Sequence, residues 1–179
     1  MSNIKKIKSY IPKSTDVFLF DTNVWLYLYC PIGNYNRYVT EAYSVFLAKV
    51  LTIKSQIVVP AQVVSEFFNV YIKLEFERKK YLAPSKFQSF KKDFRNTHNY
   101  NDTIQEISSL IKDKILKYST PTNDFFDELE ISTILDGNNF DFNDKYFQEL
   151  SRYNSYKIVT NDKDMLNCSD VEIISTQTK

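Results

Sequence analysis

The chain has 179 residues, a formal net charge of +1 and a hydrophobic content of 43%, values that fit one folded domain over residues 1–179 and exclude a disordered chain. Its only glycines are Gly33 and Gly137, so neither the dinucleotide-binding glycine motif nor the P-loop can be written in it. With one histidine and two distant cysteines, no structural zinc site is expected.

Short apolar runs alternate with longer helical patterns in the first half of the chain, which predicts an α/β fold with a parallel sheet. Residues 17–21 read as a buried strand, and residues 22–29 as the helix that follows it. A second helix is expected over 40–53 and a second strand over 57–59. A long helix then runs from residue 61 to about residue 79.

The second half of the chain is predicted to be mainly helical. Two strands close it, over residues 157–160 and 171–175. Four helices precede them, each supported by apolar spacing or by a capping residue. They are expected over residues 84–95, 102–117 and 124–135, and from Asp141 or Asn143 to about Tyr153.

Four carboxylates stand where α/β proteins place their ligand sites. Asp21 and Asp162 follow predicted strands, Asp144 lies at a helix start, and Glu66 interrupts an otherwise apolar helix stripe. The carboxyl ends of parallel strands meet at one edge of a sheet, and hard divalent cations take carboxylate oxygens as ligands. The set therefore suggests a metal pocket.

Each of these acids also has an ordinary structural explanation. Asp21 can cap a helix, Asp141 and Asp144 can cap another and interact favourably with its dipole, and Asp162 and Asp164 can form turns. Glu66 would be costly to bury on the apolar stripe unless a cation or hydrogen bonds compensate, and a neighbouring lysine is the simplest compensation. No single acid decides between the two readings, but the order and spacing of the set favour a site.

The order of these motifs resembles that of the PIN-domain nucleases, the family that includes the toxins of VapBC-type toxin–antitoxin pairs. The resemblance covers about residues 16–175, with a helical elaboration at about 75–122. Each motif is weak alone, and their order makes the match specific. The matching pieces are FLFDTN (18–23), VVPAQVVSEF (58–67), Asn-Asp (143–144) and IVTNDKD (158–164).

This resemblance implies a three-layer α/β/α sandwich around a mostly parallel sheet of about five strands. It also implies an endoribonuclease that hydrolyses RNA phosphodiester bonds with Mg²⁺ or Mn²⁺. The catalytic, metal-binding groups would be Asp21, Glu66, Asp144 and Asp162. The supporting polar groups would be Asn23, Thr160, Asp164 and Asp141.

Possible partners follow from the same resemblance: an RNA substrate, a cognate antitoxin whose tail enters the acidic pocket, and a second copy in a homodimer. The first residues lack the continuous apolar stretch of an export signal, and no apolar window is long enough to cross a bilayer. A cytoplasmic location without membrane contact is therefore expected.

Local charge is less even than the net charge. Residues 77–95 carry seven Lys or Arg against two acids, with aromatic residues interleaved. Lys79, Lys80, Lys91 and Lys92 are predicted to hold the RNA backbone. The alternative is an amphipathic helix pair with aromatics inward and lysines in solvent. Residues 124–144 contain seven acids and no Lys or Arg, an edge that would repel phosphate in the absence of metal.

Two other functions compete with the nuclease reading. A haloacid-dehalogenase-type phosphatase also begins with an apolar strand and an aspartate. Its chemistry expects a second acid where Asn23 stands here, and it leaves Glu66 without a purpose. A catalytically silent domain of the same fold would serve as an RNA or protein interaction module, although the complete acid set argues against it.

Overall fold

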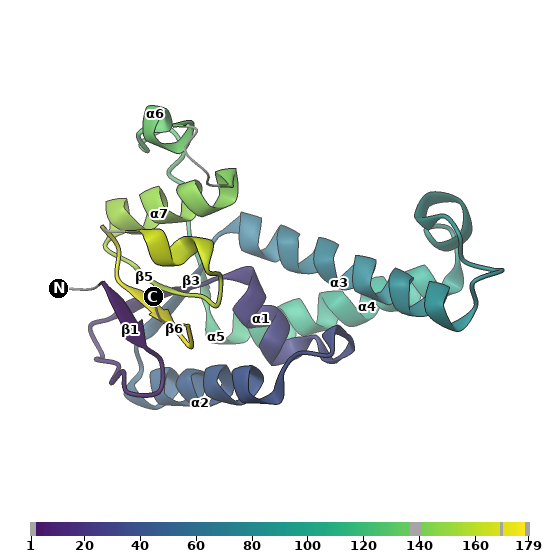
Figure 1. The fold of residues 1–179 in the computed structure, drawn as a ribbon, viewed down its shortest axis with the longest axis horizontal. Helices are drawn as coiled ribbons and strands as arrows, with labels where there is room; N and C mark the ends of the chain where they lie inside the picture. Colours follow the sequence, from purple (N-terminus) through teal and green to yellow (C-terminus); the bar gives the residue numbers. More distant parts are fainter. Residues whose placement is uncertain (1–2, 137–140, 169, 178–179) are drawn as a thin grey trace.

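The structure is a computed structural model that describes residues 3–136, 141–168 and 170–177. It contains one open sheet of six strands, all parallel, in the order β1-β6-β5-β2-β3-β4. Helices flank this sheet, which confirms the predicted α/β sandwich (Figure 1). The strands are β1 (Ile4–Lys6), β2 (Val17–Phe20), β3 (Gln56–Val59), β4 (Thr120–Pro121), β5 (Lys157–Val159) and β6 (Ile173–Ser175).

The helices connect these strands, and α2 and α7 lie on opposite sides of the sheet (Figure 1). Short 3-10 or π-helical turns separate some of them: η1 (Pro31–Gly33), η2 (Phe90–Phe94), η3 (Ile111–Ile115) and η4 (Asp164–Asn167). The α-helices are α1 (Thr22–Tyr29), α2 (Arg37–Ile53), α3 (Ala61–Leu82), α4 (His98–Leu110), α5 (Leu116–Tyr118), α6 (Ile131–Ile134) and α7 (Phe142–Asn154).

The central strand β2 is apolar along its whole length because helices cover both faces of the sheet. Phe18, Leu19 and Phe20 are fully buried. The ring of Phe46, on α2, lies 5.6 Å from that of Phe18 and 6.2 Å from that of Phe20. This packing fixes the end of β2, and with it the position of Asp21, which lies between β2 and α1.

The sheet has one strand more than the number expected from the family resemblance. The runs at residues 17–21, 57–59, 157–160 and 171–175 are strands, as predicted. Both edge strands were missed because neither contains a run of buried apolar residues: no residue of β1 is fully buried, and β4 consists of two exposed residues. They exist through pairing with β6 and β3.

Two of the predicted helices are largely wrong. Within residues 84–95 the helical part is only η2, a single π-helical turn, because Asp93 accepts hydrogen bonds from the backbone N–H groups of Gln88 and Ser89 and stabilises a turn. Within residues 124–135 only α6 is helical, and Phe125 has a left-handed φ of 48° that interrupts a helix there.

Two other helices begin earlier than predicted, and each has a capping side chain that explains its start. The Asn36 side chain accepts a hydrogen bond from the N–H of Tyr38 at the start of α2. Thr97 does the same for Tyr100 at the start of α4. Both caps are ordinary Asn and Thr signals that the apolar periodicity alone does not include.

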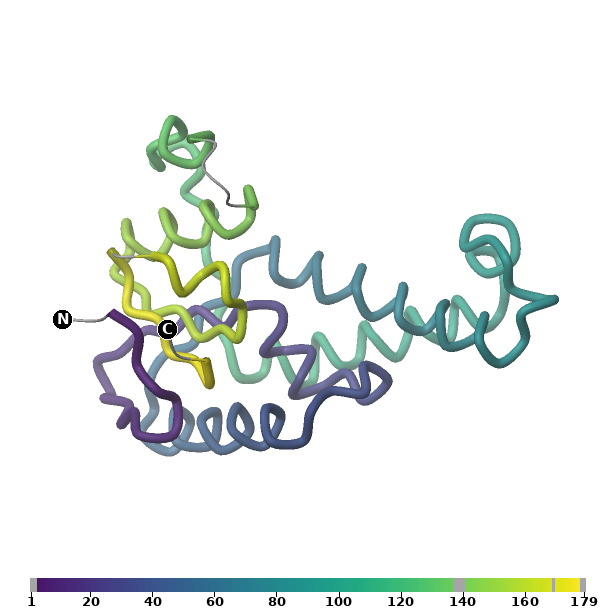
Figure 2. Tube along the Cα trace, in the orientation of Figure 1, coloured from purple at the N-terminus to yellow at the C-terminus, as the bar shows by residue number. Residues whose placement is uncertain are grey.

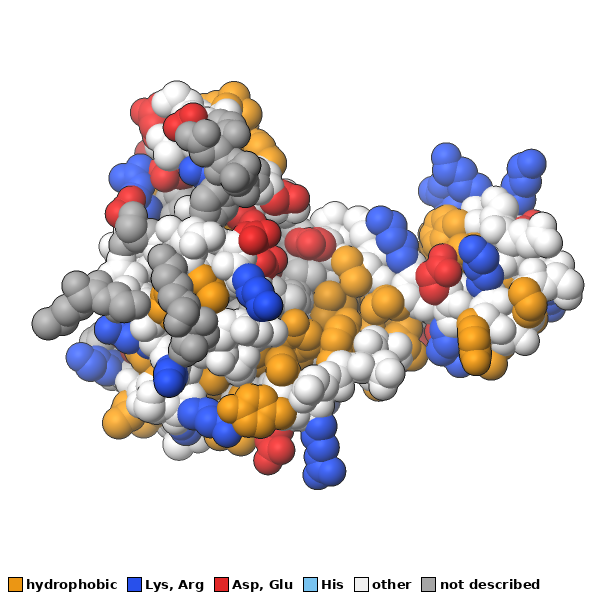
Figure 3. Space-filling view, in the orientation of Figure 1, with side chains coloured by type: hydrophobic (Ala, Val, Ile, Leu, Met, Phe, Trp, Pro, Cys, Tyr) orange, Lys and Arg blue, Asp and Glu red, His pale blue; other side chains and the backbone are white. Residues whose placement is uncertain are grey.

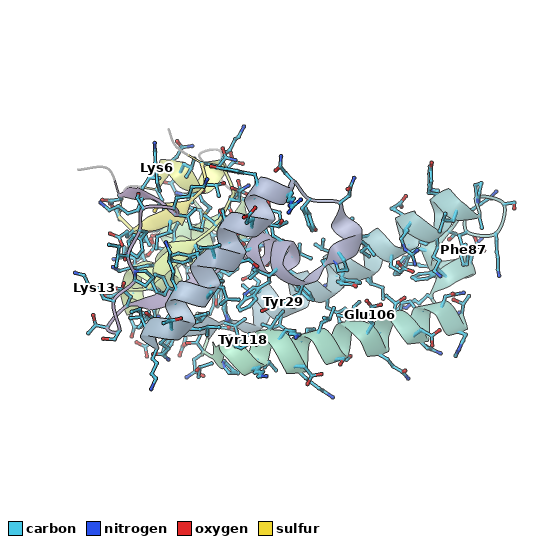
Figure 4. All side chains as sticks on the ribbon, turned by 90° about the horizontal axis from the view of Figure 1, so that it is seen from below. Lys6, Lys13, Tyr29, Phe87, Glu106 and Tyr118 are labelled. Atoms are coloured by element: carbon cyan, nitrogen blue, oxygen red, sulfur yellow. The ribbon has the colours of Figure 1, made fainter. Side chains whose placement is uncertain are left out.

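A helical hairpin formed by the end of α3 and the start of α4 projects far from the sheet, and we call its residues 73–100 the arm (Figures 1 and 2). Aromatic rings pack together at its tip, with ring centroids 5.4 to 6.2 Å apart. Seen from below, Phe87 lies at the far end of the arm, while Tyr118 lies near the sheet (Figure 4). The rings of the cluster are those of Phe76, Phe87, Phe90, Phe94 and Tyr100.

A second, smaller projection lies beyond α7 and includes α6 (Figure 1). We call its residues 124–136 the acidic segment. Leu129 and Ile134 are its buried side chains. Among the helices of the described residues, none has both the length and the apolar character needed to cross a membrane.

Candidate active site

The predicted acids meet at one cavity of about 270 Å³. It lies at the carboxyl ends of the adjacent central strands β2 and β5, the edge where parallel sheets place ligands. In the space-filling view, acidic side chains gather in the hollow between α7 and α3 (Figure 3). The lining residues are Asp21, Thr22, Asn23, Leu26, Glu66, Asp141, Asn143, Asp144, Phe147, Asp162 and Asp164.

Asp21 is fixed by hydrogen bonds at the floor of this cavity. Its backbone N–H continues the sheet by donating to the carbonyl of Val159, 3.0 Å away. It occupies the N-cap position of α1, yet its side chain does not cap that helix. The carboxylate instead accepts hydrogen bonds from the Asn23 amide and from Thr160 Oγ1, the latter at 2.6 Å. The capping explanation for Asp21 is therefore wrong.

Thr160 and Asn23, both predicted as supporting groups, link the two central strands behind Asp21. The Thr160 hydroxyl also accepts hydrogen bonds from the Asn23 amide at 3.1 Å and from the backbone N–H of Asp162 at 2.9 Å. Tyr43, on α2, donates its hydroxyl to the Thr160 carbonyl at 2.6 Å. No pattern in the sequence indicated Tyr43, because this contact joins residues 117 positions apart.

Glu66 reaches the cavity from α3 and is half-buried. Its carboxylate accepts a hydrogen bond from Thr22 Oγ1 at 2.9 Å. A neighbouring lysine was the ordinary explanation for this acid, and the partner is a hydroxyl instead. Thr22 directly follows Asp21 in the chain, so the motif that contains Asp21 also orients Glu66.

The first turn of α7 contributes two acids. Asp141 caps the helix, since its side chain accepts from the N–H of Asn143 at 2.7 Å, which agrees with its ordinary explanation. Asp144 is half-buried and faces the cavity. Across the opening, the amide of Gln62, on α3, donates to the Asn143 side chain. This bond ties the two helices that contribute Glu66 and Asp144.

Asp162 and Asp164 lie on the loop after β5. The backbone N–H of Asp164 donates to Asp162 Oδ1 at 2.9 Å, so the predicted turn does form. Asp162 is half-buried in the cavity wall, whereas Asp164 is exposed at the rim. The turn and the cavity are compatible, because one carboxylate oxygen of Asp162 closes the turn and the other is left for a ligand.

Crowding of these carboxylates changes their acidity. Burial raises the pKa of Asp21 to about 6, and the charges of Glu66 and Asp162 add to this, against the hydrogen bond from Thr160. Partial burial raises the pKa of Asp144 to about 7, with further repulsion from Asp162 and Asp21. The cavity thus holds negative charge that nothing in its lining neutralises, since no described lining residue is Lys or Arg.

The donor set fits a hard divalent cation in chemistry, because carboxylate, hydroxyl and amide oxygens are what Mg²⁺ and Mn²⁺ prefer. The geometry fits less closely. Among the described residues, no three Asp, Glu, His or Cys side chains converge as a preformed metal site. The acids share a cavity and would have to draw closer to share an ion, a movement that bound positive charge would favour by relieving their repulsion.

The four predicted backbone-binding lysines lie on the arm, away from the cavity. Lys80, Lys91 and Lys92 are exposed. Lys79 is engaged within the arm, 3.7 Å from a carboxylate oxygen of Glu75 and 3.1 Å from the Asn99 side chain. The phenylalanines of this segment pack inward, as the alternative reading of the sequence expected.

No family model and no curated protein matches the sequence. A solved structure does match: a chain in the crystal structure of VapBC2 from Rickettsia felis bound to a DNA fragment from their promoter. The match has a TM-score of 0.52 and 12% sequence identity, and it covers 89% of this chain and 98% of that chain. At this identity the likeness shows the fold alone, and that fold agrees with the one expected from the PIN-domain resemblance.

Proposed function

We propose that the chain is a metal-dependent ribonuclease whose acid groups are Asp21, Glu66, Asp144 and Asp162. The observation that carries the proposal is the meeting of these carboxylates in one cavity at the carboxyl ends of β2 and β5. Buried and half-buried acids crowded together without a basic partner in the cavity lining are unfavourable for the fold alone. Their presence together is therefore better explained by a cation that they hold, with Mg²⁺ or Mn²⁺ as the candidates.

Each residue then has a distinct task. A divalent cation held by these four acids would supply Lewis-acid polarisation of the scissile phosphodiester. Thr160 and Asn23 keep the Asp21 carboxylate pointed at the cavity, and Thr22 does so for Glu66. A bound cation would offset the repulsion from Asp162 and Asp21 that helps to raise the pKa of Asp144. Asp141 and Asp164 add negative charge at the rim.

The test is RNA cleavage by purified Asp21→Asn and Asp144→Asn proteins in Mg²⁺, in Mn²⁺ and in a chelator. Each substitution is expected to lower the rate by more than about a hundredfold. Asp102→Asn, which removes an exposed acid from α4, is the matched control and should cleave as the wild type does. Circular dichroism checks that the variants are folded. Undiminished cleavage by either pocket variant would refute the proposal.

We further propose that the chain acts with a partner protein, as the toxin of a toxin–antitoxin pair. The shared fold with a chain of the VapBC2 structure supports this, and so does the negative charge of the cavity, which suits a cationic side chain from a partner. The product of a neighbouring open reading frame should co-purify with this chain. It should also inhibit cleavage, and Asp144→Asn should weaken the complex.

A further inference from the structure

One aromatic ring of the arm is left to solvent. Tyr81, in the last turn of α3, is 86% exposed, and its neighbour Leu82 is 65% exposed. The phenylalanine rings around them belong to the tip cluster. Within the described residues, no side-chain interaction holds Tyr81. The arm therefore presents a free tyrosine on a tip whose shape is fixed by other rings.

The surface around Tyr81 is cationic. Arg78 and Lys79 pair with Glu75, and Asp93 accepts two backbone hydrogen bonds, so these charges are satisfied within the arm. The remaining exposed charges of residues 73–97 are six Lys or Arg against a single acid, Glu77. The basic residues are Lys73, Lys80, Lys86, Lys91, Lys92 and Arg95.

The helix that ends at Tyr81 is the same one that brings Glu66 to the cavity. α3 runs without interruption from Ala61 to Leu82. At 1.5 Å per residue, the fifteen residues from Glu66 to Tyr81 span about 22 Å. A stacked strand that advances about 3.4 Å per nucleotide needs about six to seven nucleotides to cover this distance.

We propose that Tyr81 is a base-stacking contact for a single-stranded stretch of the RNA substrate, about 22 Å from the acids. This inference rests on the proposed ribonuclease function. Proteins that bind single strands combine a cationic track for the backbone with exposed aromatic rings on which bases stack. The arm has both features, and α3 connects them to the cavity. The preferred substrate is thus RNA with an unpaired stretch longer than about six nucleotides.

Binding affinity tests this directly. The protein is studied in the Asp144→Asn background, so that RNA stays intact, with a fluorescent unstructured RNA of twelve nucleotides and one of four. Tyr81→Ala should weaken binding of the longer RNA by about tenfold or more, and Tyr81→Phe by less than about twofold. On the tetranucleotide, which is too short to reach Tyr81 from the acids, the Tyr81→Ala protein and the protein that keeps Tyr81 should differ by less than about twofold.

Tyr38 provides the matched control, because it is also an exposed tyrosine beside a lysine, with Lys8 Nζ 4.2 Å from its ring. It lies on α2, outside the cavity lining. Tyr38→Ala should bind both RNAs as the unsubstituted protein does. A loss equal to that of Tyr81→Ala would overturn the inference, since any exposed tyrosine would then serve.

The outcomes separate this inference from the function on which it rests. If the Tyr81→Ala protein and the protein that keeps Tyr81 bind the longer RNA equally well, the stacking contact is overturned, whether or not the wild type cleaves. Absence of cleavage by the wild type, with the Tyr81 dependence of binding intact, rejects the ribonuclease and keeps the stacking contact. No RNA binding by any variant rejects both and leaves the arm tip as a contact for protein.

Discussion

The two projections of this molecule, the arm and the acidic segment, differ in charge and in packing. Apart from Arg78, which pairs with Glu75, the arm exposes six Lys or Arg around a cluster of aromatic rings, whereas residues 124–136 contain five acids and no Lys or Arg. A formal net charge of +1 conceals this separation. Net charge is thus a poor guide to binding when opposite charges are held on separate projections.

The cavity lies between the arm and the acidic segment, so their opposite charges favour one direction for a bound strand. A phosphate backbone is repelled by the acidic segment and attracted by the arm, which favours a strand that leaves the cavity along α3. Aromatic packing has a second consequence. Because the rings hold the tip together, the arm can keep its cations at a fixed distance from the acids.

The largest expected effect comes from removing the centre of the ring cluster. Phe94 is fully buried, and its ring lies 5.7 Å from Phe76 and 5.6 Å from Tyr100. We expect Phe94→Ala to lower the local free energy of unfolding of the arm by about 3–5 kcal/mol, measured by native-state hydrogen exchange. Leu129→Ala should cost the acidic segment less, since few buried side chains surround it. Unchanged amide protection in the arm would contradict a packed tip.

Reversing the charge of the arm should have the next largest effect. Lys80→Glu, Lys91→Glu and Lys92→Glu together should weaken RNA binding by about ten- to a hundredfold, and the slope of log affinity against log salt should fall by about two. Lys79 is left unchanged, because its ion pair with Glu75 supports the arm itself.

The control for this reversal is the same change of charge at the other end of the molecule. Lys6, Lys13 and Lys54 are exposed, and Lys6 and Lys13 lie far from Phe87 (Figure 4). Their replacement by Glu should leave the salt slope nearly unchanged, because these side chains are too distant to contact RNA bound along α3. Equal slopes for the two triple variants would show that RNA responds to total charge and not to the arm.

The centre of the fold could be predicted from the sequence, and its edges could not. β2, β3 and β5 are covered by helices on both faces, so their apolar runs are visible in the chain. β1 and β4 are short and become strands only through their neighbours. In the acidic segment, a turn with the left-handed Phe125 and α6 replace the helix predicted over residues 124–135, and Phe125 and Phe126 contact tyrosine rings of α7, which no local pattern encodes.

The site shows the same division. The order of the motifs along the chain predicted that the four acids would lie close together, and they line one cavity. Asp21 and Asp162 follow β2 and β5, which are neighbours in the sheet. The side chains that orient these acids were harder to predict from the sequence. Thr22 lay within a motif already recognised, but the bond from Tyr43 to Thr160 depends on how α2 packs, which no local pattern encodes.

The raised pKa values of two cavity acids predict a smaller effect, on the pH dependence of stability. The pKa values of Asp21 and Asp144 are raised to about 6 and about 7, so the folded protein binds these protons more tightly than the unfolded chain. The free energy of unfolding of the metal-free protein should therefore fall as pH rises from about 4 to about 7. At pH 7, Asp144→Asn should be more stable than the wild type by on the order of 1 kcal/mol, after allowance for solvent screening. Addition of Mn²⁺ should stabilise the wild type and not the variant.

Neutralising the acidic segment should have the smallest effect on RNA affinity. Its sign should be opposite to that of reversing the charge of the arm. Asp127→Asn, Glu128→Gln and Glu130→Gln keep the acceptor oxygens that bond Tyr153 and Ser132, so the local structure should persist. RNA affinity should rise by about two- to fivefold at low salt and return to the wild-type value near 1 M salt, where the Debye length is about 3 Å. A gain that survives high salt would mean that the segment blocks RNA by its shape. The charge contrast between the two projections would then not be what directs the strand toward the arm.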